Sequence, residues 1–211
     1  MMDKEKIDIE SWNRKELFHF FREFAEPFYG MTADIDVTKL YRHCKANNES
    51  FFIHSVYTIL KAINSCDPLK LRIENGELYR FNKIHVSPSI GKKDGTFAFG
   101  FMYYNEDFNL FKQHMQEEIQ RIQVLEGMNL TDDARREDTI HFSAIPWVKF
   151  TSLSHARYMK SEESVPKIST GKIHEKDGHL WMPLSIHVHH SLVDGKDVAD
   201  FIERLQYLFN E

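Results

Sequence analysis

The pattern of hydrophobic and polar positions near the N-terminus predicts a helix followed by a strand. Residues 12–24 repeat hydrophobic side chains at helical spacing, and Ser11 is a possible N-cap for that helix. Residues 28–37 have the composition of a strand, although Gly30 weakens this prediction because glycine contributes no side chain to strand packing. The chain therefore starts with one helix and one strand that do not repeat later as a regular unit.

Two helices and a hairpin are predicted next. Residues 37–46 form a short helical stretch, and residues 52–63 form a stronger one. Its hydrophobic face carries Phe52, Val56, Leu60 and Ile63. In the sequence LRIENGELYRF, the pair Asn75-Gly76 separates two hydrophobic runs, which is typical of a two-residue β-hairpin.

The middle of the chain predicts two strands, a helix and a polar loop. The sequences IHVSPSI (residues 84–90) and TFAFGFMYY (residues 96–104) are typical of strands. Hydrophobic residues then recur at helical spacing, which indicates an amphipathic helix. They are Phe108, Phe111, Met115, Ile119 and Ile122. Residues 126–139 are polar and predict a loop.

The last third predicts strands and a closing helix. Residues 141–153 read as one or two strands broken at Pro146, and a second hairpin is expected at Asp177-Gly178. The sequence LWMPLSIHVHH alternates like a half-buried strand. A helix after Gly195 should bury Val198, Phe201, Ile202, Leu205 and Phe209. Because strands and helices do not alternate regularly, we expect an α+β fold with a mixed sheet, in a single domain over residues 1–211.

Composition limits the classes of function. The chain has 211 residues, 42% of them hydrophobic and 28% charged, and a formal net charge of −5 without a basic stripe. This argues against a nucleic-acid partner, which would require phosphate neutralisation. No hydrophobic run is long enough to span a bilayer and the N-terminus lacks a signal peptide, so no membrane partner is expected. Cys44 and Cys66 form no CxxC pair, and we expect a cytoplasmic protein.

Candidate chemistry is concentrated in the sequence HVHHSLVDG, residues 187–195. Strand alternation places Met182, Leu184, Ile186 and Val188 on one face. His190 shares their parity and should point inward at the strand end, where a shielded histidine can stay neutral and accept a proton. His187 and His189 should face solvent or an interface.

Three other interpretations of these residues stay open. His190 can be an ordinary hydrogen-bonded core residue, and Asp194 with Asp197 three positions later forms a helix N-cap pattern. A zinc site at His187 and His189 is weakly supported, because no further ligand motif accompanies the HxH pair. A serine hydrolase is disfavoured, since the chain has no GxSxG sequence.

The sequence HHSLVDG resembles the HHxxxDG signature of the chloramphenicol acetyltransferase family and of the wider CoA-dependent acyltransferases. The resemblance extends from about residue 7 to the C-terminus, with segments in the family's order. They are SWNRKELFHFF, IDVTKL, SAIPW, MPLSIHVHH and FIERLQYL. It implies a two-layer CoA-dependent acyltransferase-like fold, with a mixed sheet flanked by helices, that assembles as a homotrimer with active sites at the subunit interfaces.

The resemblance also implies roles for residues in the reaction. His190 matches the family's general base, and Ser143 matches the serine that stabilises the oxyanion. Asp194 matches a structural aspartate that pairs with the arginine matched by Arg14. Acetyl-CoA and the alcohol would reach the histidine through opposite ends of a tunnel, and no metal is expected.

The binding residues match the family less closely. The residues that match the acceptor pocket are Phe20, Phe21, Tyr29, Phe97 and Leu153. Phe21 stands where the family has a tyrosine, and His155 and Arg157 fall near positions that are usually hydrophobic. For the cofactor, Lys172 matches a residue that can meet a phosphate, and Ser169 matches a hydroxyl that reaches the intermediate through water. Ser50 replaces a second family lysine.

These matches predict an acetyl-CoA-dependent enzyme that acetylates the 3-hydroxyl of chloramphenicol and so confers antibiotic resistance. One alternative is the same chemistry on a different small alcohol, motivated by Phe21, His155 and Arg157. Another is a non-catalytic trimer that binds an aromatic small molecule, and a third is a metal-binding protein that uses His187 and His189.

Overall fold

The computed structural model describes residues 3–157 and 163–211. Its strands are β1 (Lys4–Ile7), β2 (Phe28–Asp36), β3 (Leu71–Glu74), β4 (Glu77–Phe81), β5 (His85–Gly91), β6 (Phe97–Phe99), β7 (Thr139–Ala144), β8 (Lys167–Thr170), β9 (His174–Lys176) and β10 (His179–His189). Its α-helices are α1 (Lys15–Arg22), α2 (Thr38–Ala46), α3 (Phe51–Asn64), α4 (Phe108–Gln123) and α5 (Gly195–Phe209). Short 3-10 turns lie at Ile9–Ser11, Asp67–Lys70 and Asp133–Arg135.

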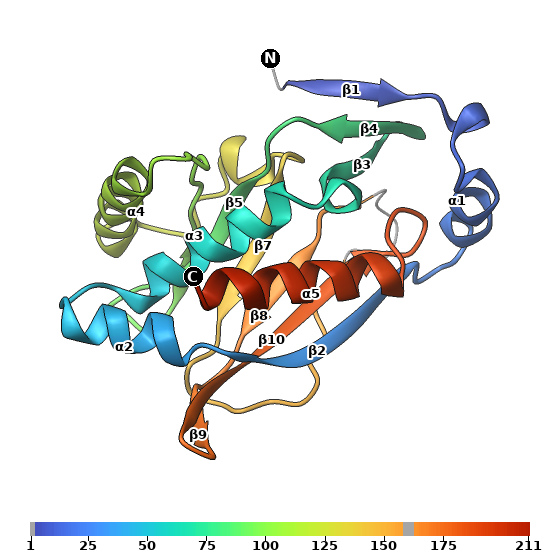
Figure 1. Ribbon diagram of the computed structural model, residues 1–211. Coiled ribbons are helices and arrows are strands. Elements are labelled where there is room, and N and C mark those ends of the chain that lie inside the picture. The colour runs from blue at the N-terminus through green and yellow to red at the C-terminus, as the bar shows by residue number, and fades with distance from the viewer. Residues whose placement is uncertain (1–2, 158–162) are drawn as a thin grey trace.

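A mixed sheet forms one layer and the helices form the other. Its strand order is β2-β10-β8-β7-β5-β6, with β9 paired to β10, and a small second sheet has the order β1-β4-β3. The pairs β5–β7 and β7–β8 are parallel, and the remaining pairs are antiparallel. In Figure 1, α2, α3 and α5 lie in front of the large sheet, and α4 lies beyond its β5 side. The predicted α+β fold with a mixed sheet and flanking helices is confirmed.

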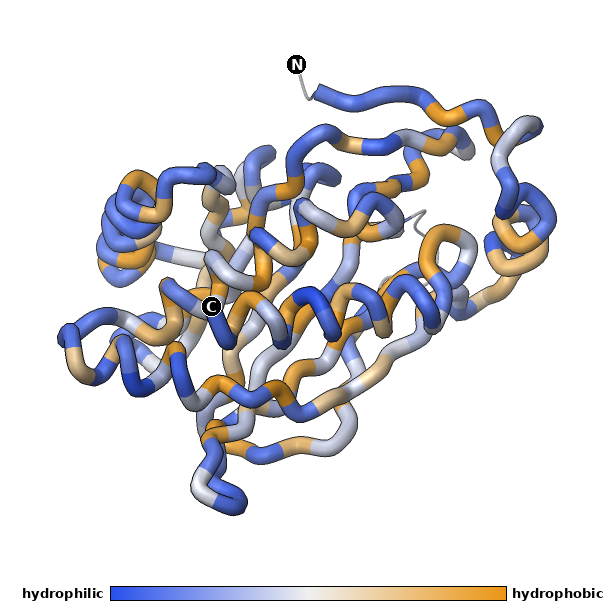
Figure 2. The backbone as a smooth tube through the Cα atoms, viewed as in Figure 1, coloured by the Kyte–Doolittle hydropathy of each residue, from blue (hydrophilic) through white to orange (hydrophobic). Residues whose placement is uncertain are grey.

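The core lies between the large sheet and α3 and α5. Met182, Leu184, Ile186 and Val188 of β10 are buried there, as the strand alternation predicts. Hydrophobic and polar positions alternate along α5 (Figure 2). The residues expected in its hydrophobic face are buried, except Ile202, which is half-buried. Leu208, which was not among them, is buried as well. Each large side chain buried in this way stabilises the fold by about 1.5–3 kcal/mol.

Both predicted hairpins are present. Asn75 and Gly76 have φ angles of 51° and 77°, and Asp177 and Gly178 have 54° and 78°. These paired positive values match the turn that joins two right-twisted strands through two residues. The second hairpin sets the register of β10 against β9, and so determines which face each residue of LSIHVH occupies.

Three predicted elements differ from the structure. The first helix begins at Lys15 rather than Trp12, because the Asp8 side chain accepts a hydrogen bond from the Glu10 N–H and caps a separate turn that ends at Ser11. The strand predicted over residues 96–104 is paired as β6 only over Phe97–Phe99, with an isolated bridge at Met102. After Pro146 no strand continues, and residues 147–157 run as irregular chain.

The face of the large sheet opposite the helices is polar. One row of paired positions across it consists of Ser89, Ser143, Ser169, Ser185 and Thr32. The next row consists of Ser87, His141, Lys167, His187 and Gly30. In Figure 1, residues 145–157 loop past the lower ends of the strands, and His155 of this stretch packs against His187 on this face.

His187 and His189, predicted to face solvent or an interface, are not open to solvent in the single chain, and their position at an interface stays a prediction. His189 is buried with 5% exposure, and His187 is half-buried. His155 packs edge-on against His187 with ring centroids 4.7 Å apart, and Phe28 packs edge-on against His189 with centroids 5.4 Å apart. Within the described residues, no helix is long and apolar enough to cross a membrane.

Candidate active site

His190 follows directly after β10, where the chain turns toward α5. Its backbone N–H donates to the carbonyl of Pro27 at 2.9 Å, which ties the strand end to the start of β2. Its ring stacks on Phe21, with centroids 3.8 Å apart and an interplanar angle of 15°, and lies 4.5 Å from the ring of Tyr29. The side chain is half-buried, and its Nδ1 is shielded from water without a hydrogen-bond partner among the described residues. The imidazole is thus held by aromatic contacts, with a ring nitrogen left unused.

Asp194 anchors the loop that carries His190. Its Oδ1 accepts hydrogen bonds from the N–H groups of Lys196 at 2.9 Å and Asp197 at 3.3 Å, and the Asp197 carboxylate accepts from the Asp194 N–H. This is the capping box of α5 that the sequence pattern predicts. The other carboxylate oxygen forms an ion pair with Arg14, which precedes α1. Asp194 therefore caps a helix and also holds two distant segments together.

Electrostatics keep this ion pair charged at neutral pH. Burial alone would raise the pKa of Asp194, but the hydrogen bonds from Arg14 and from backbone N–H groups outweigh it and lower the pKa below its usual value. Burial also raises the pKa of Tyr29 to about 12, with Asp194 as the next cause. Tyr29 is therefore a neutral phenol beside His190.

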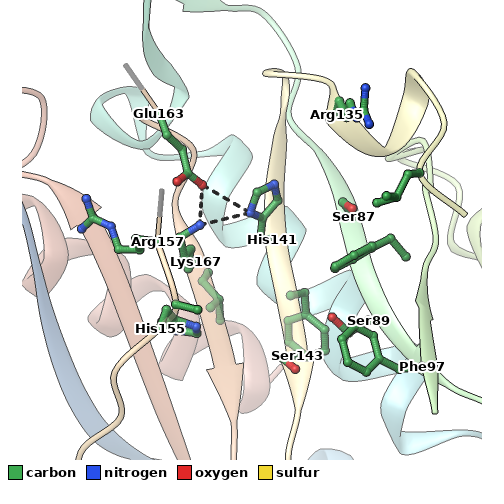
Figure 3. Close-up of a pocket in the computed structure, with 15 residues that line it drawn as sticks. Ser87, Ser89, Phe97, Arg135, His141, Ser143, His155, Arg157, Glu163 and Lys167 are labelled. Atoms are coloured by element: carbon green, nitrogen blue, oxygen red, sulfur yellow. Dashed lines mark hydrogen bonds and ion pairs between the residues drawn. The ribbon is translucent and has the colours of Figure 1, made fainter. Parts of the chain in front are cut away.

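Ser143 lies on β7 at the centre of the polar sheet face. It is paired with Ser89 on β5 and with Ser169 on β8, so three hydroxyls share one row. Ser143 and Phe97 line a cavity of about 620 Å³ on this face (Figure 3). Ser169 lies beside it, fully buried, and its hydroxyl has no partner among the described residues. The cavity thus combines hydroxyl groups with an aromatic side chain.

The residues expected to bind the acceptor fall into two groups. Phe97, His155 and Arg157 line the Ser143 cavity. Phe21 and Tyr29 surround His190, and Phe20 packs on Phe21 with a ring separation of 5.0 Å. Leu153 lies outside both groups, and its backbone accepts a hydrogen bond from His187.

One chain does not bring His190 and Ser143 together. Ser143 pairs with Ser169, which pairs with Ser185, and His190 lies five residues further along the chain. Two strand spacings and five residue rises correspond to roughly 19 Å. Consistently, His190 is absent from the lining of the Ser143 cavity. Both side chains can act on one substrate only if a second subunit supplies one of them.

A second cavity, of about 360 Å³, lies where β7 and β8 end, on the helix-covered face. Lys172 lines it together with Phe51 and Phe52 of α3. Ser50, the replacement for a family lysine, is the N-cap of α3, and its hydroxyl accepts from the Ile53 N–H at 3.4 Å. Of the two residues expected to bind cofactor, Lys172 lines this cavity and Ser169 does not.

Arg157 lines the Ser143 cavity, and its charge is paired. It forms an ion pair with Glu26, and its guanidinium lies 3.7 Å above the ring of Phe28.

Burial and nearby cations, Arg157 first among them, lower the pKa of His189 to about 4, so this histidine is neutral at pH 7. The described part of the chain contains no group of three or more His, Cys, Asp or Glu side chains that could hold a metal ion.

Sequence reasoning missed, among other lining residues, the three that form an ionic cluster in the Ser143 cavity. They are His141, Glu163 and Lys167. The parity of the strands contains the signal for two of them, because His141 lies two residues before Ser143, and Lys167 lies two residues before Ser169. Glu163 lies outside a strand, and no sequence pattern indicates its position.

Comparisons with known proteins show the family to which this chain belongs. Residues 2–206 match the family described as chloramphenicol acetyltransferase. A chloramphenicol acetyltransferase from Clostridium perfringens is 30% identical over 205 residues, which cover 96% of this chain and 93% of that protein. A solved chloramphenicol acetyltransferase structure is 29% identical, with a TM-score of 0.90 over 98% of this chain and 99% of that one. The dihydrolipoamide acetyltransferase of Azotobacter vinelandii, 17% identical, shares the fold with a TM-score of 0.69 over 93% of this chain and 86% of that one. The chain therefore belongs to the chloramphenicol acetyltransferase family.

Proposed function

We propose that this enzyme transfers the acetyl group of acetyl-CoA directly to the 3-hydroxyl of chloramphenicol, with His190 as general base. The observation that carries the proposal is the placement of His190. Its imidazole stacks on Phe21 and contacts the tilted ring of Tyr29, on a loop anchored by Arg14 and Asp194, and its Nδ1 has no partner among the described residues. A half-buried imidazole held in one orientation is suited to act as a general base.

The proposed reaction needs no acyl-enzyme. His190 takes the proton of the acceptor hydroxyl while that oxygen attacks the thioester carbonyl. The Ser143 hydroxyl donates a hydrogen bond to the oxyanion that forms, which is worth about 3 kcal/mol for one such donor. Collapse of the tetrahedral intermediate breaks the carbon–sulfur bond, and the proton held by His190 passes to the sulfur of CoA.

In this proposal the active site forms between subunits of a homotrimer. His190 with Phe20, Phe21 and Tyr29 comes from one subunit, and the Ser143 cavity with Phe97 comes from its neighbour. The distance between His190 and Ser143 within one chain supports this division. Exposed hydrophobic side chains near both halves also support it, since Phe20 is 61% exposed, Phe97 49% and Trp147 79%.

Acetyl-CoA is proposed to enter from the helix-covered face. The second cavity offers aromatic walls, and Lys172 stands exposed beside it as a cation for a phosphate. This cavity and the Ser143 cavity lie on opposite faces of β7 and β8, and Phe142 lines both. That arrangement supports entry of the two substrates from opposite ends. Ser169 is proposed to act beside Ser143, through a water, rather than on the cofactor.

The biological consequence would be antibiotic resistance in the cytoplasm, because acetylation removes a hydroxyl donor of the drug. The proposal includes no metal.

The test is thiol release from acetyl-CoA, with and without chloramphenicol, by the wild-type enzyme and by His190→Ala. We expect chloramphenicol-dependent release that falls at least about a thousandfold in the variant. His114→Ala, an exposed histidine of α4, serves as the matched control and should keep full activity. Binding of chloramphenicol without thiol release would instead support a non-catalytic binding protein. Release that is unchanged in His190→Ala would refute the assignment of the base.

A further inference from the structure

The Ser143 cavity has one wall of ionic side chains. Lys167 on β8 is 7% exposed, forms an ion pair with Glu163, and places its Nζ 3.4 Å from Nδ1 of His141. Figure 3 shows these three side chains converging on one side of the cavity. The other side presents Phe97, Phe99 and Leu130. A ligand in this space therefore meets a charged group at one end and hydrophobic surface at the other.

The charged group lies close to the serine proposed to act in catalysis. His141 pairs with Lys167 in the same way that Ser143 pairs with Ser169, one step further along the two strands. Residues two apart on a strand are separated by about 7 Å and point to the same face. Lys167 lies one strand over from Ser143 and two residues along, so an acceptor whose hydroxyl reacts at Ser143 would reach Lys167 over about 8 Å, the length of a small molecule.

The charges of the cavity favour an anion. Its cationic side chains are Arg135, Arg157 and Lys167, and its only carboxylate among the described residues is Glu163. Glu26 outside the cavity neutralises Arg157, while Arg135 is exposed and forms no ion pair within the described residues. A lysine ammonium has three N–H donors, and within residues 3–157 and 163–211 Lys167 has two partners, Glu163 and His141, which leaves one donor for a ligand.

The two histidines of the cavity do not alter this balance. Burial, followed by Lys167, lowers the pKa of His141 to about 4. Burial, followed by His187 and Lys167, lowers the pKa of His155 to about 4 as well. Both are neutral at pH 7, and Nε2 of His155 is buried without a partner among the described residues. They can provide hydrogen bonds to a ligand without adding charge.

We propose that the preferred acceptor of this enzyme is a small alcohol that carries a carboxylate, and that Lys167 binds that carboxylate. Glu163 is the counter-ion of Lys167 when the cavity is empty, because a buried ammonium without a partner is costly. Chloramphenicol is neutral, and it would leave the third N–H of Lys167 without a charged partner. The inference rests on the proposed function in one respect, since it takes the Ser143 cavity as the acceptor site.

The test compares two probes that differ only in charge. Tropate (3-hydroxy-2-phenylpropanoate) has a primary hydroxyl, a phenyl ring and a carboxylate, and its methyl ester lacks the charge. Binding is measured by titration calorimetry, and acetylation by thiol release, for the wild-type enzyme. We expect tropate to bind at least about tenfold more tightly than methyl tropate, as a hydrogen bond to a charged group implies.

The variants show whether Lys167 is responsible. In Lys167→Met/Glu163→Gln, which removes both charges of the pair, the preference for tropate should fall by about 10- to 100-fold. Lys176→Met, an exposed lysine on β9, should keep the wild-type preference. Lys167→Arg keeps the charge and should retain most of the preference for tropate. This variant therefore separates a loss of charge from a loss of folding.

The outcomes separate this inference from the proposed function. Equal or tighter binding of the ester, an unchanged preference in the double variant, or no binding of tropate at millimolar concentration would each overturn the inference. Charge-selective binding with no thiol release from any acceptor would support the anion site and contradict acetyl transfer. Thiol release with chloramphenicol, without any preference between tropate and its ester, would support acetyl transfer and contradict the anion site.

Discussion

The imidazole of His190 lies nearly parallel to the ring of Phe21, with the two ring centroids 3.8 Å apart. This contact comes from α1, more than a hundred residues away in the chain, and it orients the histidine that we propose as the base. Phe21 stands at a position where the family resemblance expects a tyrosine. Its position shows a second role for an aromatic residue there, which is to support the histidine.

Replacement of this ring should reduce turnover more than substrate binding. We expect Phe21→Leu to lower kcat by about tenfold, because an aromatic contact of this kind is worth about 1 kcal/mol beyond its buried area. Phe21→Tyr keeps the stacked ring and should retain kcat within about twofold. Steady-state kinetics with acetyl-CoA as the varied substrate measures both. A wild-type kcat in Phe21→Leu would show that the stacking does not position His190.

The ion pair between Arg14 and Asp194 should matter for stability and for activity. Asp194→Asn preserves the helix cap but removes the charge, and we expect a loss of about 2 kcal/mol in the free energy of unfolding. This is below the value for a fully buried pair, since the Asp194 side chain is 36% exposed. The loop that carries His190 loses an anchor, so kcat should fall as well. Thermal unfolding and kinetics measure the two effects.

A surface ion pair of the same helix provides the control. Lys196 and Asp200 are paired at an exposed position of α5. Asp200→Asn should change the free energy of unfolding by less than about 0.5 kcal/mol, as is usual for exposed i,i+4 pairs. Equal effects of the two substitutions would contradict an anchoring role for Asp194.

Gly30 is required by the histidine across the strand pair. A Cβ at this position would lie 2.3 Å from Nε2 of His187, which is far inside van der Waals contact. We expect Gly30→Ala to destabilise the protein by about 1–3 kcal/mol, and the cost to disappear when His187→Ala is also present. Gly91→Ala, where an added Cβ meets nothing within 4 Å, is the control. If the losses in the free energy of unfolding from Gly30→Ala and His187→Ala simply add in the double variant, the clash is not the cause.

Buried histidines should make the protein acid-sensitive. Burial is the largest cause that lowers the pKa of His85 and of His189 to about 4. In the unfolded chain both titrate near 6.5, so between about pH 6.5 and about pH 4 the unfolded state binds more protons. Stability therefore falls as the pH is lowered through this window, by up to about 1.4 kcal/mol per pH unit for each histidine.

Denaturant unfolding at fixed protein concentration, at several pH values in that window, measures the slope. His189→Gln should make it shallower, whereas His114→Gln at an exposed site of α4 should leave it unchanged. A slope that is the same in both variants would show that His189 is protonated in the folded protein.

Local patterns predicted much of this fold. The turns at Asn75-Gly76 and Asp177-Gly178, the alternation along β10 and the cap at Asp194 each depend on a few neighbouring residues. The burial of His189 could not be predicted in this way. His189 packs against the ring of Phe28, over which Arg157 lies, and no periodicity brings these distant residues together.

The arrangement of the candidate site likewise depends on contacts between distant segments, which sequence patterns do not reveal. Family resemblance indicated His190, Ser143, Asp194 and Arg14 as separate positions. It could not show that Lys167 and His141 share a row across two strands, because strand pairing between segments 26 residues apart is a tertiary property. It implied active sites at subunit interfaces, but it did not indicate how far apart His190 and Ser143 lie within one chain.

The most direct test of the shared active site mixes two inactive variants. His190→Ala and Ser143→Ala subunits are unfolded together, refolded as mixed trimers, and assayed for thiol release from acetyl-CoA with chloramphenicol. Each mixed trimer then contains one site with an intact His190 and an intact Ser143 from neighbouring subunits, so random mixing should restore about a quarter of wild-type activity. Activity no higher than that of the two separate variants would contradict a site built from His190 of one subunit and Ser143 of the next.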